Sequence, residues 1–217
     1  NKKEKHVFRF SLFSTMSEVV AFNVGKTTTQ TSAGALVYNS VNVDTHSGYS
    51  TTTGQYTAQV EGVYVISFSL ASAASTSLNG VNYATLRLGS NILTCVYTLD
   101  AGQDMTTQTV LIDTVVGHSL SVVLSDGPAY SDIRYQTAFM GFLYSPTRSL
   151  SYAWSVSTQN SFTAIDPVPF EIVFVNRGSG WNTATYKYTV QAPGVYYIHL
   201  TAGMYFNSTA GVGFPVK

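Results

Sequence analysis

Alternating apolar and polar positions run through the first two thirds of the chain in short segments. Residues 62–71 place large apolar residues such as Tyr64 and Phe68 on one side and smaller residues between them. Residues 84–88 and 119–124 repeat this two-residue period. The period is typical of half-buried β-strands, because successive strand side chains point to opposite faces. No segment keeps a 3.6-residue period with helix caps, so the pattern predicts an all-β sandwich or jelly roll.

Some of the predicted strands also carry apolar residues on their second face. Val63 and Val65 do so in one strand, and Met140 and Phe142 do so in another. In an isolated sandwich these side chains would face water, whereas packing against another subunit would cover them. Scattered apolar side chains are also normal on a protein surface, so the pattern leaves both interpretations open.

An internal repeat is the most informative feature of the sequence. Residues 20–71 and 152–203 align without gaps at an offset of 132 residues and share 16 identities in 52 positions. A period this long predicts a duplicated domain rather than a solenoid of small units. We therefore divide the chain into a leader or linker at 1–17, a first domain at 18–146, a linker at 147–151 and the N-terminal half of a second domain at 152–217.

Charge and composition exclude several classes of protein. Only 10% of the residues are charged, and 11 basic and 11 acidic residues give a net charge of zero. This balance excludes a nucleic-acid binder that neutralises phosphates, and the 45% hydrophobic content argues against a disordered chain. No stretch approaches 18 consecutive apolar residues, so no transmembrane helix is predicted. The chain's one cysteine, Cys95, excludes an internal disulfide, and its apolar neighbours favour a small buried hydrophobe over a nucleophile.

Segments that resemble catalytic signatures lack the essential parts of those signatures. Residues 25–27 (Gly-Lys-Thr) resemble the end of a phosphate-binding P-loop, but Val20 stands where the earlier glycine belongs, which predicts a surface loop. Residues 117–119 (Gly-His-Ser) lack the closing glycine of a nucleophile elbow and predict a hairpin turn. The four histidines are dispersed along the chain, and no Asp-x-Asp-x-Asp-Gly loop occurs. The sequence therefore predicts that the protein is not an enzyme.

The loop between the last two predicted strands of the first domain combines aromatic and charged residues. It contains Tyr130, Asp132, Arg134 and Tyr135. Loops on rigid β scaffolds commonly carry binding residues, and tyrosine and arginine suit ligand contact, including stacking on sugar faces. We predict these four residues as ligand-binding; the alternative is an ordinary polar loop anchored by a buried tyrosine.

Four stretches of the first domain resemble the globular head of complement component C1q, a ten-stranded jelly roll shared with the tumour necrosis factor superfamily. They are residues 20–24, 41–64, 110–124 and 139–143, which are similar in order and spacing to the opening strand, the central signature, the next two strands and the closing strand of that family. The first two stretches recur in the second repeat. Tyr56, Glu61 and His118 depart from the family's usual phenylalanine, proline and acidic residue.

The resemblance implies a secreted, extracellular recognition module with a lectin-like role in innate immunity. Such a module would form a homotrimer and bind carbohydrate, a microbial surface or an extracellular protein. The alternative is a structural or signalling protein whose heads drive trimer assembly or receptor binding, and direct binding to glycans or microbes would separate the two. The sequence itself predicts no cofactor, while the resemblance allows Ca²⁺. In a secreted chain, Asn207 of the sole Asn-x-Ser/Thr sequon would be a glycosylation site.

Overall fold

The computed structural model describes residues 19–72, 81–99, 104–146, 152–158, 167–193, 198 and 200. The strands of the first repeat are β1 (Ala21–Gly25), β2 (Gly34–Ala35), β3 (Ser40–Asp44), β4 (Tyr49–Ser50), β5 (Gln55–Thr57), β6 (Gly62–Ser72), β7 (Val81–Leu88), β8 (Asn91–Leu99), β9 (Asp104–Thr114), β10 (Ser119–Asp126) and β11 (Ala138–Ser145). No helix occurs in the described ranges, so the all-β prediction is confirmed.

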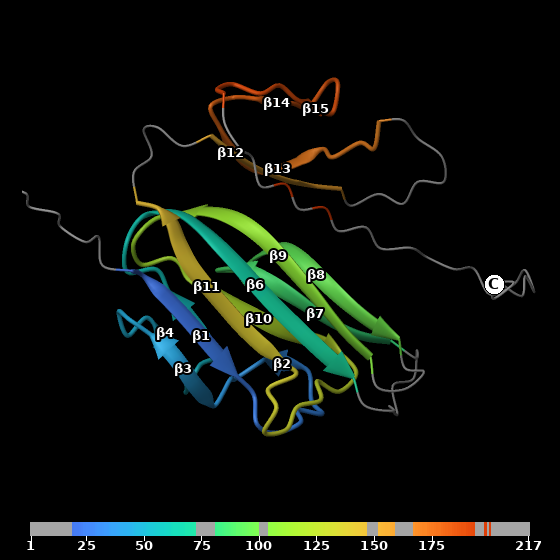
Figure 1. Ribbon diagram of the computed structural model, residues 1–217. Coiled ribbons are helices and arrows are strands. Elements are labelled where there is room, and N and C mark those ends of the chain that lie inside the picture. The colour runs from blue at the N-terminus through green and yellow to red at the C-terminus, as the bar shows by residue number, and fades with distance from the viewer. Residues whose placement is uncertain are drawn as a thin grey trace, which may run out of the picture.

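Two antiparallel sheets pack face to face as a jelly roll (Figure 1). One sheet has the strand order β3-β1-β11-β6-β9, and we call it the inner sheet. One of its faces packs on the core, and the other faces solvent. The outer sheet has the order β4-β5-β10-β7-β8, with the two-residue β2 paired to β10. The chain crosses repeatedly between the sheets, so strands distant in sequence become neighbours: β1 pairs with β11, and β10 pairs with β5 and β7.

The hydrophobic core lies between the two sheets and follows the predicted alternation. In β6, the side chains of Tyr64, Ile66, Phe68 and Leu70 are at most 1% exposed, while the residues between them are only partly buried. The corresponding core positions of β10 are Leu120, Val122 and Leu124. Burial of these apolar side chains is the main favourable contribution to the free energy of folding.

Aromatic rings fill the centre of the core. Phe22 stacks on Tyr56 with ring centroids 4.0 Å apart and meets Phe139 edge-on at 4.8 Å. Gly141 lies directly against this cluster, because a Cβ at that position would meet Ile66 and would lie 2.6 Å from Phe22 Cε1. The absence of a side chain at Gly141 therefore permits the close approach of the Phe22 ring.

The second repeat reproduces the local structure of the first. Its strands β12 (Ala153–Ser157) and β13 (Ile172–Arg177) pair like β1 and β3, with a register irregularity at the equivalent place. The short strands β14 (Trp181–Asn182) and β15 (Lys187–Tyr188) also pair with each other. Trp154 stacks on Tyr188 at 3.8 Å, and these two residues lie 132 positions after Phe22 and Tyr56. The sequence repeat is therefore a structural repeat.

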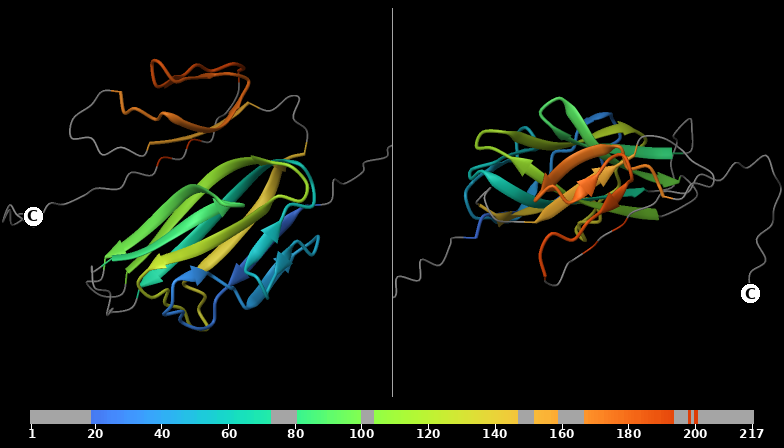
Figure 2. Two further views of the ribbon diagram at one scale, coloured as in Figure 1. Left: turned by 180° about the vertical axis from the view of Figure 1, so that it is seen from behind. Right: turned by 90° about the horizontal axis from the view of Figure 1, so that it is seen from above.

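The second repeat lies at the end of the sandwich where β6 begins and β9 ends (Figures 1 and 2). Its strands β12 and β13 are neighbours of β9. Among the described residues, no helix has the length and apolar character needed to span a membrane.

Candidate functional site

The β10–β11 loop, residues 127–137, lies at the opposite end of the sandwich, where β6 ends. Two backbone bridges hold its first part in place: Ala129 pairs with Gln30, and Tyr130 pairs with Ala71. Each bridged backbone group has a hydrogen-bond partner, so this part of the loop is fixed to the sheets on both sides. The backbone of residues 129 and 130 is therefore fixed in position and supports the side chains of the rest of the loop.

Two buried hydroxyl groups also fix the loop through hydrogen bonds to the backbone. Ser131 Oγ donates a hydrogen bond to the backbone oxygen of Lys26 at 2.6 Å. Thr137 Oγ1 donates to the oxygen of Tyr130 at 2.7 Å and accepts from the Ala71 amide at 3.1 Å. Sequence reasoning missed Ser131 and Thr137, since the only signal is the general tendency of serine and threonine to bond nearby backbone.

Asp132 organises the exposed part of the loop. Its carboxylate accepts hydrogen bonds from the Arg134 backbone amide at 2.7 Å and from Arg134 Nη2 at 2.7 Å. The Tyr130 hydroxyl donates to the same carboxylate at 3.4 Å, and the Asp132 amide donates to Gln136 Oε1 at 3.1 Å. The hydrogen bonds from Arg134 lower the pKa of Asp132 to about 2. The carboxylate is thus ionised at neutral pH and holds the guanidinium in one orientation at the surface.

Tyr135 points away from this group. Its φ of +56° is unusual for a residue other than glycine and turns the side chain toward β1. The ring lies so close to Gly25 that a Cβ there would be 2.7 Å from Tyr135 Cδ1. Ser40 Oγ donates to the Tyr135 hydroxyl at 3.3 Å. Of the four predicted binding residues, the structure therefore brings Tyr130, Asp132 and Arg134 together and separates Tyr135 from them.

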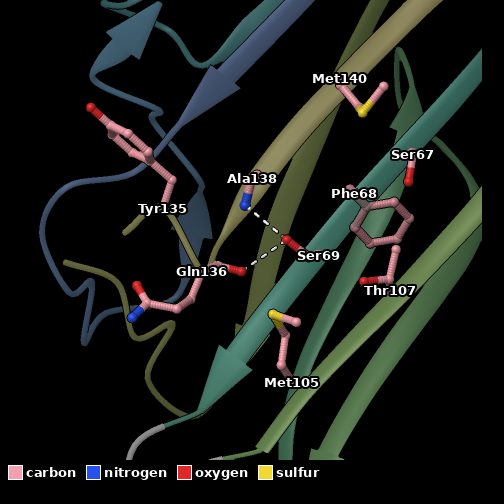
Figure 3. A pocket seen from close by; sticks show the side chains of 9 residues that line it. All are labelled: Ser67, Phe68, Ser69, Met105, Thr107, Tyr135, Gln136, Ala138 and Met140. Carbon is pink, nitrogen blue, oxygen red and sulfur yellow. Dashed lines mark hydrogen bonds between the residues drawn. The ribbon is translucent and has the colours of Figure 1, made fainter. Parts of the chain in front are cut away.

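A shallow pocket of about 210 Å³ lies beside the loop, on the solvent-facing side of the inner sheet (Figure 3). The apolar side chains of Met105 and Met140 line it together with the polar side chains of Ser67, Ser69, Thr107 and Gln136, and the lining also includes Phe68, Tyr135 and Ala138. Ser69 Oγ donates to the Gln136 oxygen and accepts from the Ala138 amide, so the pocket wall is tied to the loop. The lining offers hydroxyl and amide groups over an apolar floor and carries no carboxylate or imidazole for acid–base chemistry.

The solvent-facing side of the inner sheet also carries a continuous apolar row. The strand register places Ala21, Phe142, Val65 and Leu111 side by side across β1, β11, β6 and β9. Phe142 is 38% exposed, and Met140 on the same face is 40% exposed, as the pattern of second-face residues predicted. Val63 departs from that expectation, because it is fully buried although it lies outside the core cluster.

Three other predictions from the sequence have clear outcomes. The Gly-Lys-Thr segment is not simply a surface loop, since Lys26 is buried, its Nζ donates to the Val37 oxygen at 3.1 Å, and burial lowers its pKa. Cys95 is a free thiol that is half-buried on β8, so the prediction of a small buried hydrophobe was wrong about the extent of burial, although burial raises the pKa of the thiol. Asn207 lies outside the described residues.

The family model for the C1q domain matches this chain twice, over residues 21–144 and residues 153–214. The chain belongs to the C1q domain family. The two matched segments coincide with the two repeats, which confirms tandem C1q copies. A search of the curated proteins found no match.

Solved structures similar to this C1q chain share less than a fifth of its residues in the aligned regions. The globular domain of zebrafish complement 1qA protein is 18% identical, with a TM-score of 0.45 over 60% of this chain and 100% of that one. The Eiger TNF from S. frugiperda is 8% identical, with a TM-score of 0.49 over 63% and 99% of the two chains. Murine APRIL is 6% identical, with a TM-score of 0.46 over 58% and 98%.

Metal ligands do not gather in the described part of this C1q chain, where no group of three or more His, Cys, Asp or Glu side chains is close enough to hold an ion. His118 lies exposed in the turn between β9 and β10, which confirms the turn predicted at residues 117–119. The predicted hairpin is wrong, because β9 and β10 belong to different sheets and the turn carries the chain from one sheet to the other. Candidates for interaction with other molecules in the described part of the chain include the loop around Asp132, the adjoining pocket and the apolar row of the inner sheet.

Proposed function

We propose that this C1q-domain protein is a secreted, non-enzymatic recognition protein. It assembles as a homotrimer through the solvent-facing side of the inner sheet and binds carbohydrate on microbial or other extracellular surfaces through the β10–β11 loop and its pocket. Membership of the C1q family supports an extracellular recognition or signalling role. The absence of a carboxylate pair or imidazole from the pocket lining favours binding over catalysis.

The apolar row of the inner sheet is the observation that carries the assembly proposal. Phe142, Val65 and Leu111 lie on three adjacent strands of a sheet whose other face already packs on the core. Covering such a row with another subunit would contribute about 25 cal/mol to the free energy of association for every Å² of apolar surface removed from water. Further copies of this chain are the natural occupants, because the same face is present on every copy and symmetric association closes into a ring.

The pocket beside the loop supports carbohydrate as the ligand class. Sugars present an apolar C–H face and a rim of hydroxyl groups, which match the methionine floor and the Ser69, Thr107 and Gln136 groups of the wall. Arg134 precedes the lining residues Tyr135 and Gln136 in the same loop, and its side chain is 75% exposed and held by Asp132. A pocket of this size suits one sugar ring or a single side chain rather than a large organic ligand.

The assembly proposal is tested by replacing one residue of the apolar row. Phe142→Glu should convert the trimer to monomers, measured by light scattering after size-exclusion chromatography. Val116→Glu is the control, because Val116 is also apolar and is 60% exposed but lies in the turn between β9 and β10, outside the apolar row. A wild-type chain that stays monomeric at high concentration, or a Phe142→Glu chain that stays trimeric, would overturn the assembly proposal.

The ligand proposal is tested on a panel of glycans and microbial surfaces, with Ca²⁺ and with chelator. Arg134→Gln should weaken binding to the glycans that the wild-type chain selects, whereas Lys187→Gln, an exposed charge loss in the second repeat, should not. Loss of binding under chelator would place a metal in the site. Trimers that bind no glycan but bind a host protein would instead support the structural or signalling function, and turnover of any sugar would support an enzyme.

A further inference from the structure

We propose that the second repeat docks on the first repeat of its own chain through the Arg177–Asp113 ion pair, so that the two heads form one fixed unit. The pair is bidentate: Arg177 Nε lies 3.2 Å from Asp113 Oδ2, and Nη2 lies 2.9 Å from Oδ1. The Arg177 side chain is only 9% exposed. A guanidinium withdrawn from water in this way is held by its geometry as well as its charge, unlike a mobile surface pair.

The surroundings of the pair show an interface rather than an isolated contact. Asp113 lies on the solvent-facing side of β9, where its register partner on β6 is Val63. Val63 is fully buried and yet outside the core cluster, so it is covered from the face that Arg177 approaches. One step along β6, Val65 is only partly buried, which limits the covered area to the end of the inner sheet. The second repeat therefore occupies that end and leaves the apolar row around Phe142 free.

The contact can be made only by the second repeat. The position in the first repeat that corresponds to Arg177 is Thr45, 132 residues earlier. Thr45 has neither the charge nor the length to reach an aspartate on another domain, and its hydroxyl already donates to the Val19 oxygen at 2.6 Å. Two first repeats therefore cannot dock on each other in this way, and the pairing of a second repeat with a first repeat is specific.

The connection between the repeats favours docking within one chain. Five residues, 147–151, separate Pro146 from Tyr152. Such a segment spans at most about 20 Å when fully extended, because each residue adds roughly 3.3–3.6 Å. A partner held this close has an effective concentration in the millimolar range, above that of a second chain in solution. Two heads fixed to each other would present their binding loops at a constant separation.

The partners of this contact can be identified by cross-linking. In a Cys95→Ser background, Val116→Cys and Ser179→Cys place one exposed thiol on each repeat close to Asp113 and Arg177, leave the ion pair intact, and can be joined by a short bis-maleimide. Unlabelled and uniformly ¹⁵N-labelled chains are mixed in urea and refolded together, so that any oligomer contains both kinds of chain, and the joined peptides are weighed by mass spectrometry after the reaction. Peptide pairs with uniform labelling support docking within a chain. Mixed pairs alone, or no joined peptide, would overturn the proposal.

The role of the ion pair itself is tested by hydrogen exchange of the full chain. An isolated pair of strands is marginally stable, so the amides of β12 and β13 should depend on docking for protection. Asp113→Asn and Arg177→Gln should each speed their exchange roughly tenfold or more, and the charge-reversed double variant Asp113→Arg/Arg177→Asp should restore part of the protection. Arg134→Gln, which breaks an ion pair within one loop, is the matched control.

Unchanged exchange in both single variants would refute the role of the ion pair. These measurements do not depend on the trimer or on the ligand, because they compare two repeats of one chain. A chain that fails to trimerise could still show uniformly labelled cross-links, and a trimer could show none. The docking proposal and the proposed function can therefore be refuted independently of each other.

Discussion

The hydroxyl group of Tyr38 should cost the protein stability, and its removal should make the fold more stable. Tyr38 is completely buried beside Phe139, and its hydroxyl has no hydrogen-bond partner in the described part of the chain. Burial accordingly raises the pKa of Tyr38 well above its usual value. The second repeat already carries the alternative side chain, because Phe170 stands at the equivalent position. Tyr38→Phe therefore introduces the side chain that the second repeat already has at this position.

The expected magnitude follows from two opposing terms. A buried polar group without a partner costs about 1–3 kcal/mol relative to its hydrated state. Removing it leaves a void of roughly 10–15 Å³, about the size that one water needs. At about 24 cal/mol per Å³, that void costs only about 0.3 kcal/mol. Tyr38→Phe should therefore raise the free energy of unfolding by about 1–2 kcal/mol, which corresponds to a Tm increase of roughly 2–8 °C.

Tyr49→Phe is the matched control and should act in the opposite direction. The Tyr49 hydroxyl accepts a hydrogen bond from the backbone amide of Tyr38 at 2.8 Å. Removing that oxygen leaves a buried N–H without a partner, which should lower the free energy of unfolding by about 1–3 kcal/mol. The two variants make the same chemical change on neighbouring rings, so their difference reports hydrogen bonding rather than ring packing.

Both effects can be measured by urea unfolding followed by circular dichroism at neutral pH, with thermal unfolding as a second measurement. The two tryptophans, Trp154 and Trp181, lie in the second repeat, so their fluorescence reports that part separately. A loss of more than about 1 kcal/mol in Tyr38→Phe would show that the hydroxyl has a partner, since the void term alone cannot account for it. Equal losses in both variants would equally contradict the reasoning.

Three further predictions concern other parts of the first repeat. Gly62→Ala should lower the free energy of unfolding by roughly 2–4 kcal/mol in urea titrations, because φ is +148° and a Cβ would meet the Ser145 oxygen; a neutral result would contradict this backbone geometry. Arg134→Gln should raise the pKa of Asp132 from about 2 toward its usual value of 3.8, measured by NMR titration, and an unchanged pKa would mean that backbone amides alone hold the carboxylate. Stability should fall as the pH rises above 10, because the unfolded chain loses phenol protons that the fold retains; Tyr38→Phe should reduce this slope by up to about 1.4 kcal/mol per pH unit, and an unchanged slope in alkaline unfolding curves would argue against it.

Several features of the fold could be predicted because they depend on short-range periodicity. The alternation at residues 62–71 predicted β6, and the side chains expected on its inner face are those in the core. The repeat at an offset of 132 aligned Trp154 with Phe22 and Tyr188 with Tyr56, and in the structure both pairs stack. These features are visible in sequence since neighbours on a strand face recur every two residues, and duplicated domains retain their core pairs.

The candidate site was only partly predictable. The residue types of the β10–β11 loop indicated contact with a ligand, but their directions depend on backbone conformation, and the positive φ of Tyr135 turns that ring toward β1. Ser131 and Thr137 support the loop by hydrogen bonds to segments far away in sequence, such as Lys26 more than a hundred residues earlier. No local pattern identifies such partners, because strand order alone decides which segments meet at one end of a sandwich.

The sequence by itself determined that this chain is all-β and carries two tandem repeats, because the alternation and the internal repeat are properties of residue order; the C1q family came from the resemblance of its motifs. The tertiary structure alone decided which apolar side chains face solvent, since Val63 and Phe142 both lie on second faces yet one is buried and the other exposed. It also decided the pairing of Arg177 with Asp113, 64 residues apart and in different repeats. Burial and ion pairing depend on the distances between elements, and these distances exist only after the sheets have packed.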